Sequence, residues 1–395
     1  MKEIVINNKS YDMSSPTSHE YAKKYVESFG DDYIDPSLPN IEVNLNSSSV
    51  DGYFIELKTN IQNSFDVEIF DENDKLIYET KLANNMFSKL NRTYYTKWKT
   101  KLRLGRLVLE HVFDLENSRV FIVFESSSLG DTIAWMPYCE EFRKKHNCHV
   151  IVSTFRNDMF EKIYPNIEFV ARGQVVNNIK ALYRLGWFYD KDKEPILPSL
   201  VPLQKSATNI LGLDYTELHS PIFFEPKERP YSEKYVCIAP SSTAGCKLWN
   251  NPTGWVELTK YLKEIGYKVV NISKDGENIE GVDMIEDDSI ENTKNVIYHS
   301  EFMIGLSSGL SWLSWALGKH VVMISNFTEA NHEFNINCTR IVNQSVCNGC
   351  WNNPKFKFDK GDWYWCPEHK GTERQFECHK SITADMVINQ IQHLL

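Results

Sequence analysis

The sequence predicts two Rossmann-like α/β domains, preceded by a small antiparallel β domain and followed by a cysteine-rich metal-binding segment. Three observations support this prediction. Hydrophobic residues alternate with period two from Val43 onwards, strand and helix patterns alternate from Val120, and that alternation restarts after the proline-flanked stretch Pro221–Pro230. The expected domain boundaries are residues 1–115, 116–228 and 229–395, with the metal-binding segment at residues 347–378.

The N-terminal part contains the signals of a β domain but no catalytic constellation. Its first forty residues are polar, with a loop expected at Ser14–Ser18 and a short helix at Glu20–Phe29. Strand-like segments then follow at Tyr53–Leu57, Phe65–Phe70, Leu76–Thr80, Tyr94–Trp98 and Leu102–Val108. We interpret this domain as a module for assembly or for contact with an acceptor.

The central motif of the chain is a strand, turn and helix between Val120 and Pro137. Val120–Phe124 is a run of β-branched and aromatic residues, which is typical of a buried strand. A helix is expected to open at Leu129, so that Asp131 lies beyond the carboxyl end of the strand, where ligands bind in open α/β sheets. Aspartate is also a common helix N-cap, and that alternative stays open here.

Further elements are expected on both sides of the linker. Glycines mark two helix ends, Gly212 and Gly266. The predicted strands are His149–Ser153, Ile167–Val170, Tyr235–Pro240, Lys268–Ile272, Phe302–Leu306 and His320–Ser325, and the predicted helices are Met159–Ile163, Ser206–Leu211 and Trp255–Ile265.

Composition narrows the possible functions. A formal net charge of −10 argues against nucleic-acid binding, which usually requires a basic surface. We see no apolar run of membrane-spanning length and no signal peptide, so we expect a cytoplasmic protein. In that compartment the nine cysteines are better interpreted as metal ligands or core residues than as disulfides.

Two loops of the second half are suited to anions. The loop Ser241–Trp249 carries hydroxyls, including that of Thr243, and one ammonium group, that of Lys247. Ser307, Ser308 and Gly309 follow a strand and start a helix, whose unpaired amides favour a phosphate. The alternatives are an ordinary polar loop and a plain N-cap at Ser308, but two such loops together favour a nucleotide diphosphate.

The cysteines of the C-terminal segment are spaced like metal ligands. Cys347 and Cys350 form a CxxC motif, and Cys366 and Cys378 follow within a loop-rich, tryptophan-rich stretch. Four thiolates suit a tetrahedral structural site, which zinc or iron could occupy. A redox CxxC is the alternative, and His369 and His379 are possible additional ligands. Cys246 has no obvious role in an anion loop, and we interpret it as a small core residue.

The most distinctive motifs are the SLGD turn Ser128–Asp131, the segment GLSSGLSWLSWALGK at Gly305–Lys319, and the cysteine tail with CNGCW, DWYWCP and GTERQFEC. The N-terminal domain adds VDGYFIEL, the Asp66–Tyr78 hairpin and YYTKW. Together they resemble the bacterial autotransporter heptosyltransferases, a branch of the heptosyltransferase family of GT-B glycosyltransferases. The resemblance covers nearly the whole chain except its first thirty residues.

This resemblance implies an inverting transfer of heptose from ADP-heptose to a serine hydroxyl of an autotransporter adhesin. Asp131 would be the general base, and Lys247, Thr243 and residues Ser307–Gly309 would hold the diphosphate. The family also implies structural iron at Cys347, Cys350, Cys366 and Cys378, with zinc as the alternative, and assembly into dodecameric rings.

Two other functions compete with this one. The enzyme could use another nucleotide sugar or a lipopolysaccharide or capsule acceptor, although core heptosyltransferases lack both the β domain and the cysteine tail. The chain could also be a metal-clipped assembly protein that retains the fold without activity.

Overall fold

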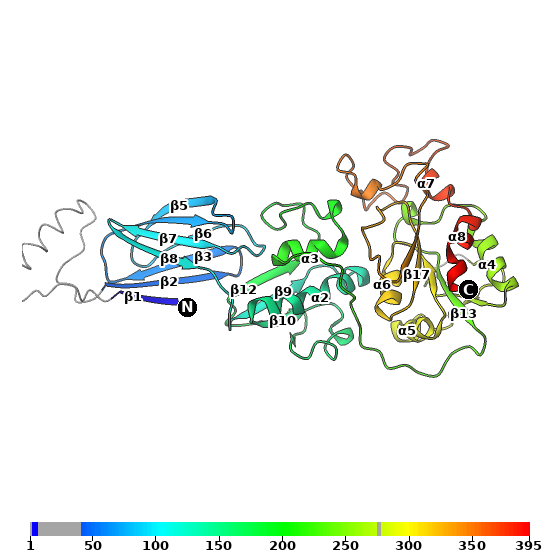
Figure 1. The fold of residues 1–395 in the computed structure, drawn as a ribbon, viewed down its shortest axis with the longest axis horizontal. Helices are drawn as coiled ribbons and strands as arrows, with labels where there is room; N and C mark the ends of the chain where they lie inside the picture. Colours follow the sequence, from blue (N-terminus) through cyan, green and yellow to red (C-terminus); the bar gives the residue numbers. More distant parts are fainter. Residues whose placement is uncertain (1, 7–40, 275–277) are drawn as a thin grey trace, which may run out of the picture.

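The computed structural model describes residues 2–6, 41–274 and 278–395. A β domain, a first α/β unit and a second α/β unit follow one another along the long axis of the molecule (Figure 1). The loop and helix expected at Ser14–Ser18 and Glu20–Phe29 lie outside the described residues. Within the described ranges, no helix is both long enough and apolar enough to cross a membrane.

The β domain consists of antiparallel strands in two sheets. The first contains β1 (Lys2–Ile6), β2 (Ile41–Ser49), β3 (Tyr53–Thr59) and β6 (Met86–Lys89), and the second contains β4 (Phe65–Phe70), β5 (Leu76–Leu82), β7 (Lys99–Leu104) and β8 (Leu107–Val112). The period-two pattern buries alternate side chains, as expected for half-buried strands. Tyr53 stacks on Trp98 at 5.2 Å between ring centroids, which joins the layers.

Two expected strands of this domain are wrong. Tyr94–Trp98 is irregular, because its aromatic side chains pack into the core while its backbone connects β6 to β7. The stretch Leu102–Val108 is interrupted by a hairpin turn, in which Gly105 has a φ of +56°. The apolar pattern does not reveal this turn, because the strands before and after it bury side chains in the same core.

The first α/β unit is built on a parallel sheet with the strand order β11, β10, β9, β12. Its elements are β9 (Arg119–Phe124), α2 (Leu129–His146), β10 (His149–Ser153), β11 (Glu168–Phe169), β12 (Ala181–Leu185) and α3 (Leu203–Leu211). Gly212 ends α3 in the left-handed conformation, as predicted. The helix expected at Met159–Ile163 is instead a 3₁₀ turn at Asn157–Met159. A single pairing of Ala181 with Ser49 joins this sheet to that of the β domain.

The second α/β unit contains a six-stranded parallel sheet in the order β15, β14, β13, β16, β17, β18. Its strands are β13 (Tyr235–Ala239), β14 (Lys268–Asn271), β15 (Asp283–Met284), β16 (Met303–Gly305), β17 (Val321–Ile324) and β18 (Cys338–Ile341). Its helices are α4 (Gly254–Glu264), α5 (Ile290–His299), α6 (Gly309–Ala316), α7 (Glu377–Lys380) and α8 (Ala384–Ile391). The two parallel sheets confirm the predicted pair of Rossmann-like units.

Helices α2 and α6 bring the two α/β units together. A Cβ atom on Gly130 would lie 3.0 Å from the Trp312 ring, and one on Gly309 would lie 3.2 Å from Leu129 Cβ. Both glycines therefore allow a close approach that any side chain would crowd. As a result, the N-terminal ends of the two helices meet where the first and second units face each other.

Candidate active site

Asp131 lies in the first turn of α2, directly after the buried strand β9. Ser128 is the N-cap residue, so the alternative that Asp131 caps this helix is wrong. The Oδ2 atom of Asp131 accepts hydrogen bonds from Ser126 Oγ at 2.5 Å and from Trp187 Nε1 at 2.7 Å. The side chain is buried, and two donors hold one of its oxygens in a fixed orientation.

The electrostatic environment of Asp131 combines burial with nearby positive charge. Burial raises the pKa of the Asp131 carboxyl above its ordinary value of 3.8. The hydrogen bonds from Ser126 and Trp187 oppose this rise, as do the charges of Lys247 and Lys360. A carboxylate whose pKa is raised in this way is a stronger base than an exposed aspartate.

Lys247 ends a short 3₁₀ turn, Gly245–Lys247, in the loop that follows β13. Its ammonium nitrogen lies 5.5 Å from the centroid of the Phe327 ring. Because its charge acts on Asp131, the sequence-predicted cation and the sequence-predicted base are brought together from the two α/β units. Thr243, in the same loop, is exposed.

The start of α6 presents a hydroxyl without a protein partner. Ser308 is the N-cap residue and has an extended backbone, but its side chain makes no cap hydrogen bond. In the part of the chain that the structure describes, its buried Oγ atom has no hydrogen-bond partner. Ser307 differs, because its Oγ donates to Glu333 Oε1 at 2.5 Å. The arrangement at Ser308 and Gly309 is suited to an anion.

The cysteine segment, residues 347–378, forms a pocket with five thiols. Cys347, Cys350, Cys366 and Cys378 line it as predicted, and Cys246 lines it from the loop after β13. The prediction that Cys246 is a core residue is confirmed, since it is buried beside Cys366 in an aromatic cluster. All nine cysteines of the chain are free thiols.

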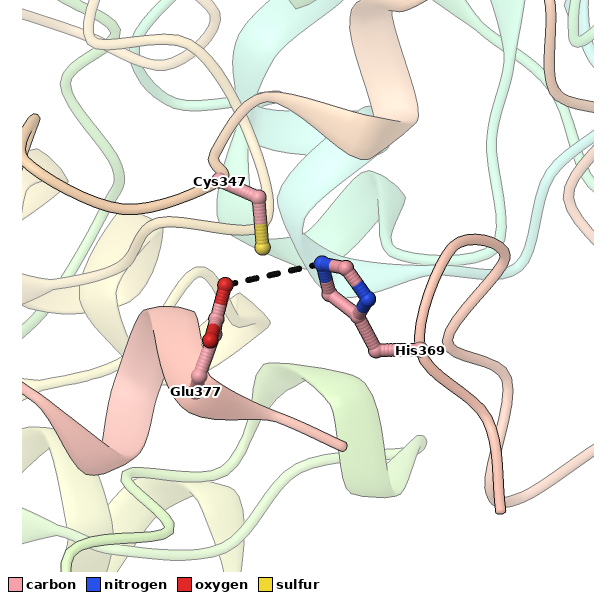
Figure 2. A group of neighbouring side chains, drawn as sticks. All are labelled: Cys347, His369 and Glu377. Atoms are coloured by element: carbon pink, nitrogen blue, oxygen red, sulfur yellow. Dashed lines mark ion pairs between the residues drawn. The ribbon is translucent and has the colours of Figure 1, made fainter. Parts of the chain in front are cut away.

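A second set of donor atoms overlaps this pocket, which Cys347 and His369 line. The ligand atoms of Cys347, His369 and Glu377 are within 4.8 Å of one another, and Figure 2 shows these three side chains converging. His369 Nε2 and Glu377 form an ion pair at 3.5 Å. Burial, together with the nearby Glu377 carboxylate, raises the pKa of Cys347 to about 11, and burial beside Cys347 and Cys366 raises that of Cys350 to about 12. A bound cation would reverse this effect, since it favours the thiolate.

Sequence reasoning missed Trp187 and Lys360. Trp187 follows β12, and its position after Gly186 at the carboxyl end of a parallel strand was the signal that could have found it. Lys360 lies in the cysteine segment, and nothing in its local sequence indicates that its charge acts on Asp131.

Comparison with known proteins identifies the family. No family model matches the chain. The autotransporter heptosyltransferase Aah of Escherichia coli is 38% identical over 321 residues, which cover 77% of this chain and 82% of Aah. The chain belongs to the autotransporter heptosyltransferases. Members of this family are named as glycosyltransferases, and the predicted family is therefore confirmed.

A solved relative extends the likeness to the fold. The dodecameric, iron-containing heptosyltransferase TibC, solved with ADP-D-β-D-heptose, superposes with a TM-score of 0.78 at 31% identity. The match covers 89% of this chain and 95% of TibC. Another relative, BimC of Burkholderia thailandensis, is 33% identical over 305 residues, covering 73% of this chain and 72% of BimC, and is named as inactive. The family therefore includes a member that is named as inactive.

Proposed function

We propose that this protein transfers heptose from ADP-heptose to serine hydroxyls of an autotransporter adhesin, with inversion at the anomeric carbon. The observation that carries this proposal is Asp131, a buried carboxylate held by two donors, with Lys247 of the other α/β unit close enough to act on its charge. A base and a phosphate-binding cation that converge from two Rossmann-like units are what such a transfer requires.

In this mechanism Asp131 removes the proton from the serine hydroxyl of the acceptor. The hydroxyl oxygen forms a bond to the anomeric carbon as the bond between that carbon and the ADP oxygen breaks. Lys247, Thr243 and the Ser308 hydroxyl bind the diphosphate, together with the free amides at the start of α6 around Gly309. Their charges and dipoles stabilise the ADP that departs with a negative charge.

Ser307 acts in a different way from Ser308 in this proposal. Its hydroxyl is occupied by Glu333, which is buried and paired with Arg340. We therefore assign Ser307 the task of holding the loop before α6 in place, while Ser308 and Gly309 face the diphosphate.

For the cysteine segment we propose structural iron bound by Cys347, Cys350, Cys366 and Cys378, with zinc as the alternative. The chemistry of the donor set supports this, because the four thiols of this segment line one narrow pocket and the segment has little helix or strand. His369 and Glu377 are the competing donors, since they approach Cys347 most closely. The ion would cross-link loops and take no part in the transfer.

We further propose that the protein works in the cytoplasm and assembles into dodecameric rings; the proposed dodecamer is supported by TibC, which is dodecameric. In this view residues 1–115 serve assembly or acceptor binding, residues 116–228 face the acceptor, and residues 229–395 bind the donor. Exposed apolar side chains on β6, Met86 and Phe87, give the β domain a surface that an assembled state would cover.

The test is transfer by the purified protein. ADP-heptose, ADP-glucose, GDP-mannose and UDP-glucose are each offered with an adhesin passenger fragment, and the acceptor mass is measured. A heptose-sized increase with ADP-heptose alone supports the proposal. Transfer from another donor, or only to lipopolysaccharide or capsule glycan, would replace it with the corresponding alternative. Absence of binding to every donor would favour the assembly protein.

A further inference from the structure

Trp351 connects the cysteine segment to the base side of the active site. It directly follows Cys350 in a 3₁₀ turn, Cys350–Asn352. Its ring meets that of Trp187 edge to face, with centroids 5.4 Å apart and planes at 88°. Aromatic contacts of this geometry are attractive and directional, so the position of one ring restricts that of the other.

The remaining contacts of Trp351 hold it from the second α/β unit. Its ring also contacts Phe327, His332 and Phe358, at 5.9, 6.0 and 5.3 Å between centroids. The next residue, Asn352, donates to the Ser199 carbonyl at 2.8 Å. Trp351 therefore lies where the cysteine segment touches the first α/β unit, and its only aromatic neighbour from that unit among the described residues is Trp187.

Trp187 passes this restraint to Asp131. Its indole nitrogen donates to Asp131 Oδ2 at 2.7 Å, and its ring contacts Trp135 of α2 at 6.1 Å. The loop that carries Trp187 has no regular secondary structure. A ring on a loop needs packing on both sides to hold its N–H in one direction, and Trp351 supplies one of those sides.

An independent contact connects the same segment to Lys247. The Trp363 carbonyl accepts a hydrogen bond from the Gly245 amide at 3.0 Å. A Cβ atom on Gly245 would lie 2.7 Å from that carbonyl oxygen, so the two backbones touch. Cys246, the next residue, lines the cysteine pocket, and Lys247 follows it. The turn that presents Lys247 is thus packed on the cysteine segment from two sides.

We propose that the cysteine segment positions both halves of the active site, with Trp351 orienting Asp131 through Trp187, and Trp363 fixing the Gly245–Lys247 turn. Trp351 and Trp363 are positioning residues under this proposal, since neither touches Asp131 or Lys247 directly. The proposal deepens the proposed function and rests on it. It also gives the bound ion a consequence beyond local stability, because loosening the segment would displace base and cation together.

The first experiment replaces Trp351 by alanine and by phenylalanine. For Trp351→Ala we expect kcat to fall about tenfold or more, because the base is no longer held in line with the hydroxyl, while ADP affinity stays unchanged. The acid limb of the pH profile should move to higher pH, since the carboxylate loses part of its hydrogen bonding. Lys247 and Lys360 are the charged groups acting on Asp131 from the neighbouring loops. Trp351→Phe keeps a ring and should restore most of kcat.

The second experiment replaces Gly245 by alanine and uses Gly361→Ala as a matched control. A Cβ atom at Gly245 must push against backbone, whereas at Gly361 the nearest atom is a side-chain oxygen of Asp359 at 3.2 Å. We expect Gly245→Ala to weaken ADP binding about tenfold by calorimetry and to raise KM more than it lowers kcat. Gly361→Ala should bind ADP as the wild type does.

A third measurement needs no activity. Hydrogen exchange is compared between the metal-loaded protein and the protein after chelation, and we expect faster exchange around Trp187 and in residues 241–249, but not in strands of the β domain such as β4. The proposal is overturned if chelation opens only the cysteine segment. It is also overturned if Trp351→Ala retains its metal and the wild-type pH profile and kcat. Absence of transfer by the wild type would instead refute the proposed function. The hydrogen-exchange comparison does not depend on transfer and would still test the positioning proposal.

Discussion

The buried ion pair between Glu333 and Arg340 should be one of the largest single contributors to the stability of the second α/β unit. Arg340, from β18, donates to the carboxylate of Glu333, and it also donates to Thr328 Oγ1 at 2.6 Å. Glu333 is 4% exposed, and it accepts the Ser307 hydroxyl at the start of the donor-binding loop. Replacing Arg340 by methionine removes the charge while keeping most of the volume.

The magnitude follows from burial and pKa. Burial alone would raise the pKa of Glu333, but Arg340 and His332 outweigh it and lower that pKa from 4.5 to about 2. At 1.36 kcal/mol per pKa unit, the pairing contributes about 3 kcal/mol at neutral pH. Removing one partner of a buried pair costs about 3–5 kcal/mol, because the other charge stays buried and uncompensated.

The lowered pKa of Glu333 determines how the stability difference between variant and wild type changes with pH. A carboxyl with a lowered pKa stabilises the fold above pH 4.5, and this contribution is lost as the pH falls towards 2. In Arg340→Met the pKa of Glu333 is no longer lowered, and the carboxyl can protonate on mild acidification. We therefore expect the stability difference between variant and wild type to be largest near pH 7 and to shrink towards pH 4.

The assay is urea denaturation followed by tryptophan fluorescence at pH 7 and pH 4. Arg119→Met is the matched control, because it removes an arginine from a half-exposed pair with Glu168 at 3.5 Å, which should cost about 0–1 kcal/mol. A loss at pH 7 no larger than that of the control would refute the reasoning. An equal loss at both pH values would show that Arg340 acts by packing and not by charge.

Three further predictions follow from the same contacts. Lys247→Ala should weaken ADP binding about tenfold or more, measured by calorimetry, and an unchanged Kd would remove Lys247 from the diphosphate site. Burial raises the pKa of Glu194 to about 8, so the wild type loses stability as the pH rises from about 4.5 to 8. Glu194→Gln should therefore be more stable than the wild type by about 5 kcal/mol at pH 9 in thermal unfolding, and no pH-dependent gain would contradict this. Cys378→Ser should lower bound iron or zinc by elemental analysis together with Tm, and full metal content would assign the site to Cys347, His369 and Glu377.

Local patterns were sufficient for the strand and helix that carry the predicted base. The β-branched run before Glu125 forms β9, and α2 begins at Leu129 as expected. The pattern could not distinguish a capping role for Asp131 from a chemical one. That distinction depends on Trp187, which is distant in sequence and reaches Asp131 only through the fold.

Strand β12 shows why part of the site stayed hidden. Ala181–Leu185 is short and includes Arg184, so it lacks the continuous apolar run that predicted β9. It becomes a strand because β9 pairs with it in parallel, and that pairing is not a local property of the chain. Missing β12 also meant missing Trp187, which lies two residues after its end.

The cysteine segment illustrates the opposite case. Spacing alone identified Cys347, Cys350, Cys366 and Cys378 as one group, and the structure places all four around one pocket. Spacing could not reveal that Cys246, a hundred residues away, lines the same pocket. This contact arises from packing between the loop after β13 and the segment, which sequence reasoning had treated as separate features.

The most direct test of the central claim compares heptose transfer by the wild type and by Asp131→Asn, with ADP-heptose and a passenger fragment, followed by acceptor mass. Because one relative in the same family is named as inactive, transfer has to be measured with this protein itself. We expect transfer by the wild type, a loss of at least about a hundredfold in Asp131→Asn, and equal ADP affinity in both. Undiminished transfer by Asp131→Asn would contradict the assignment of Asp131 as the base.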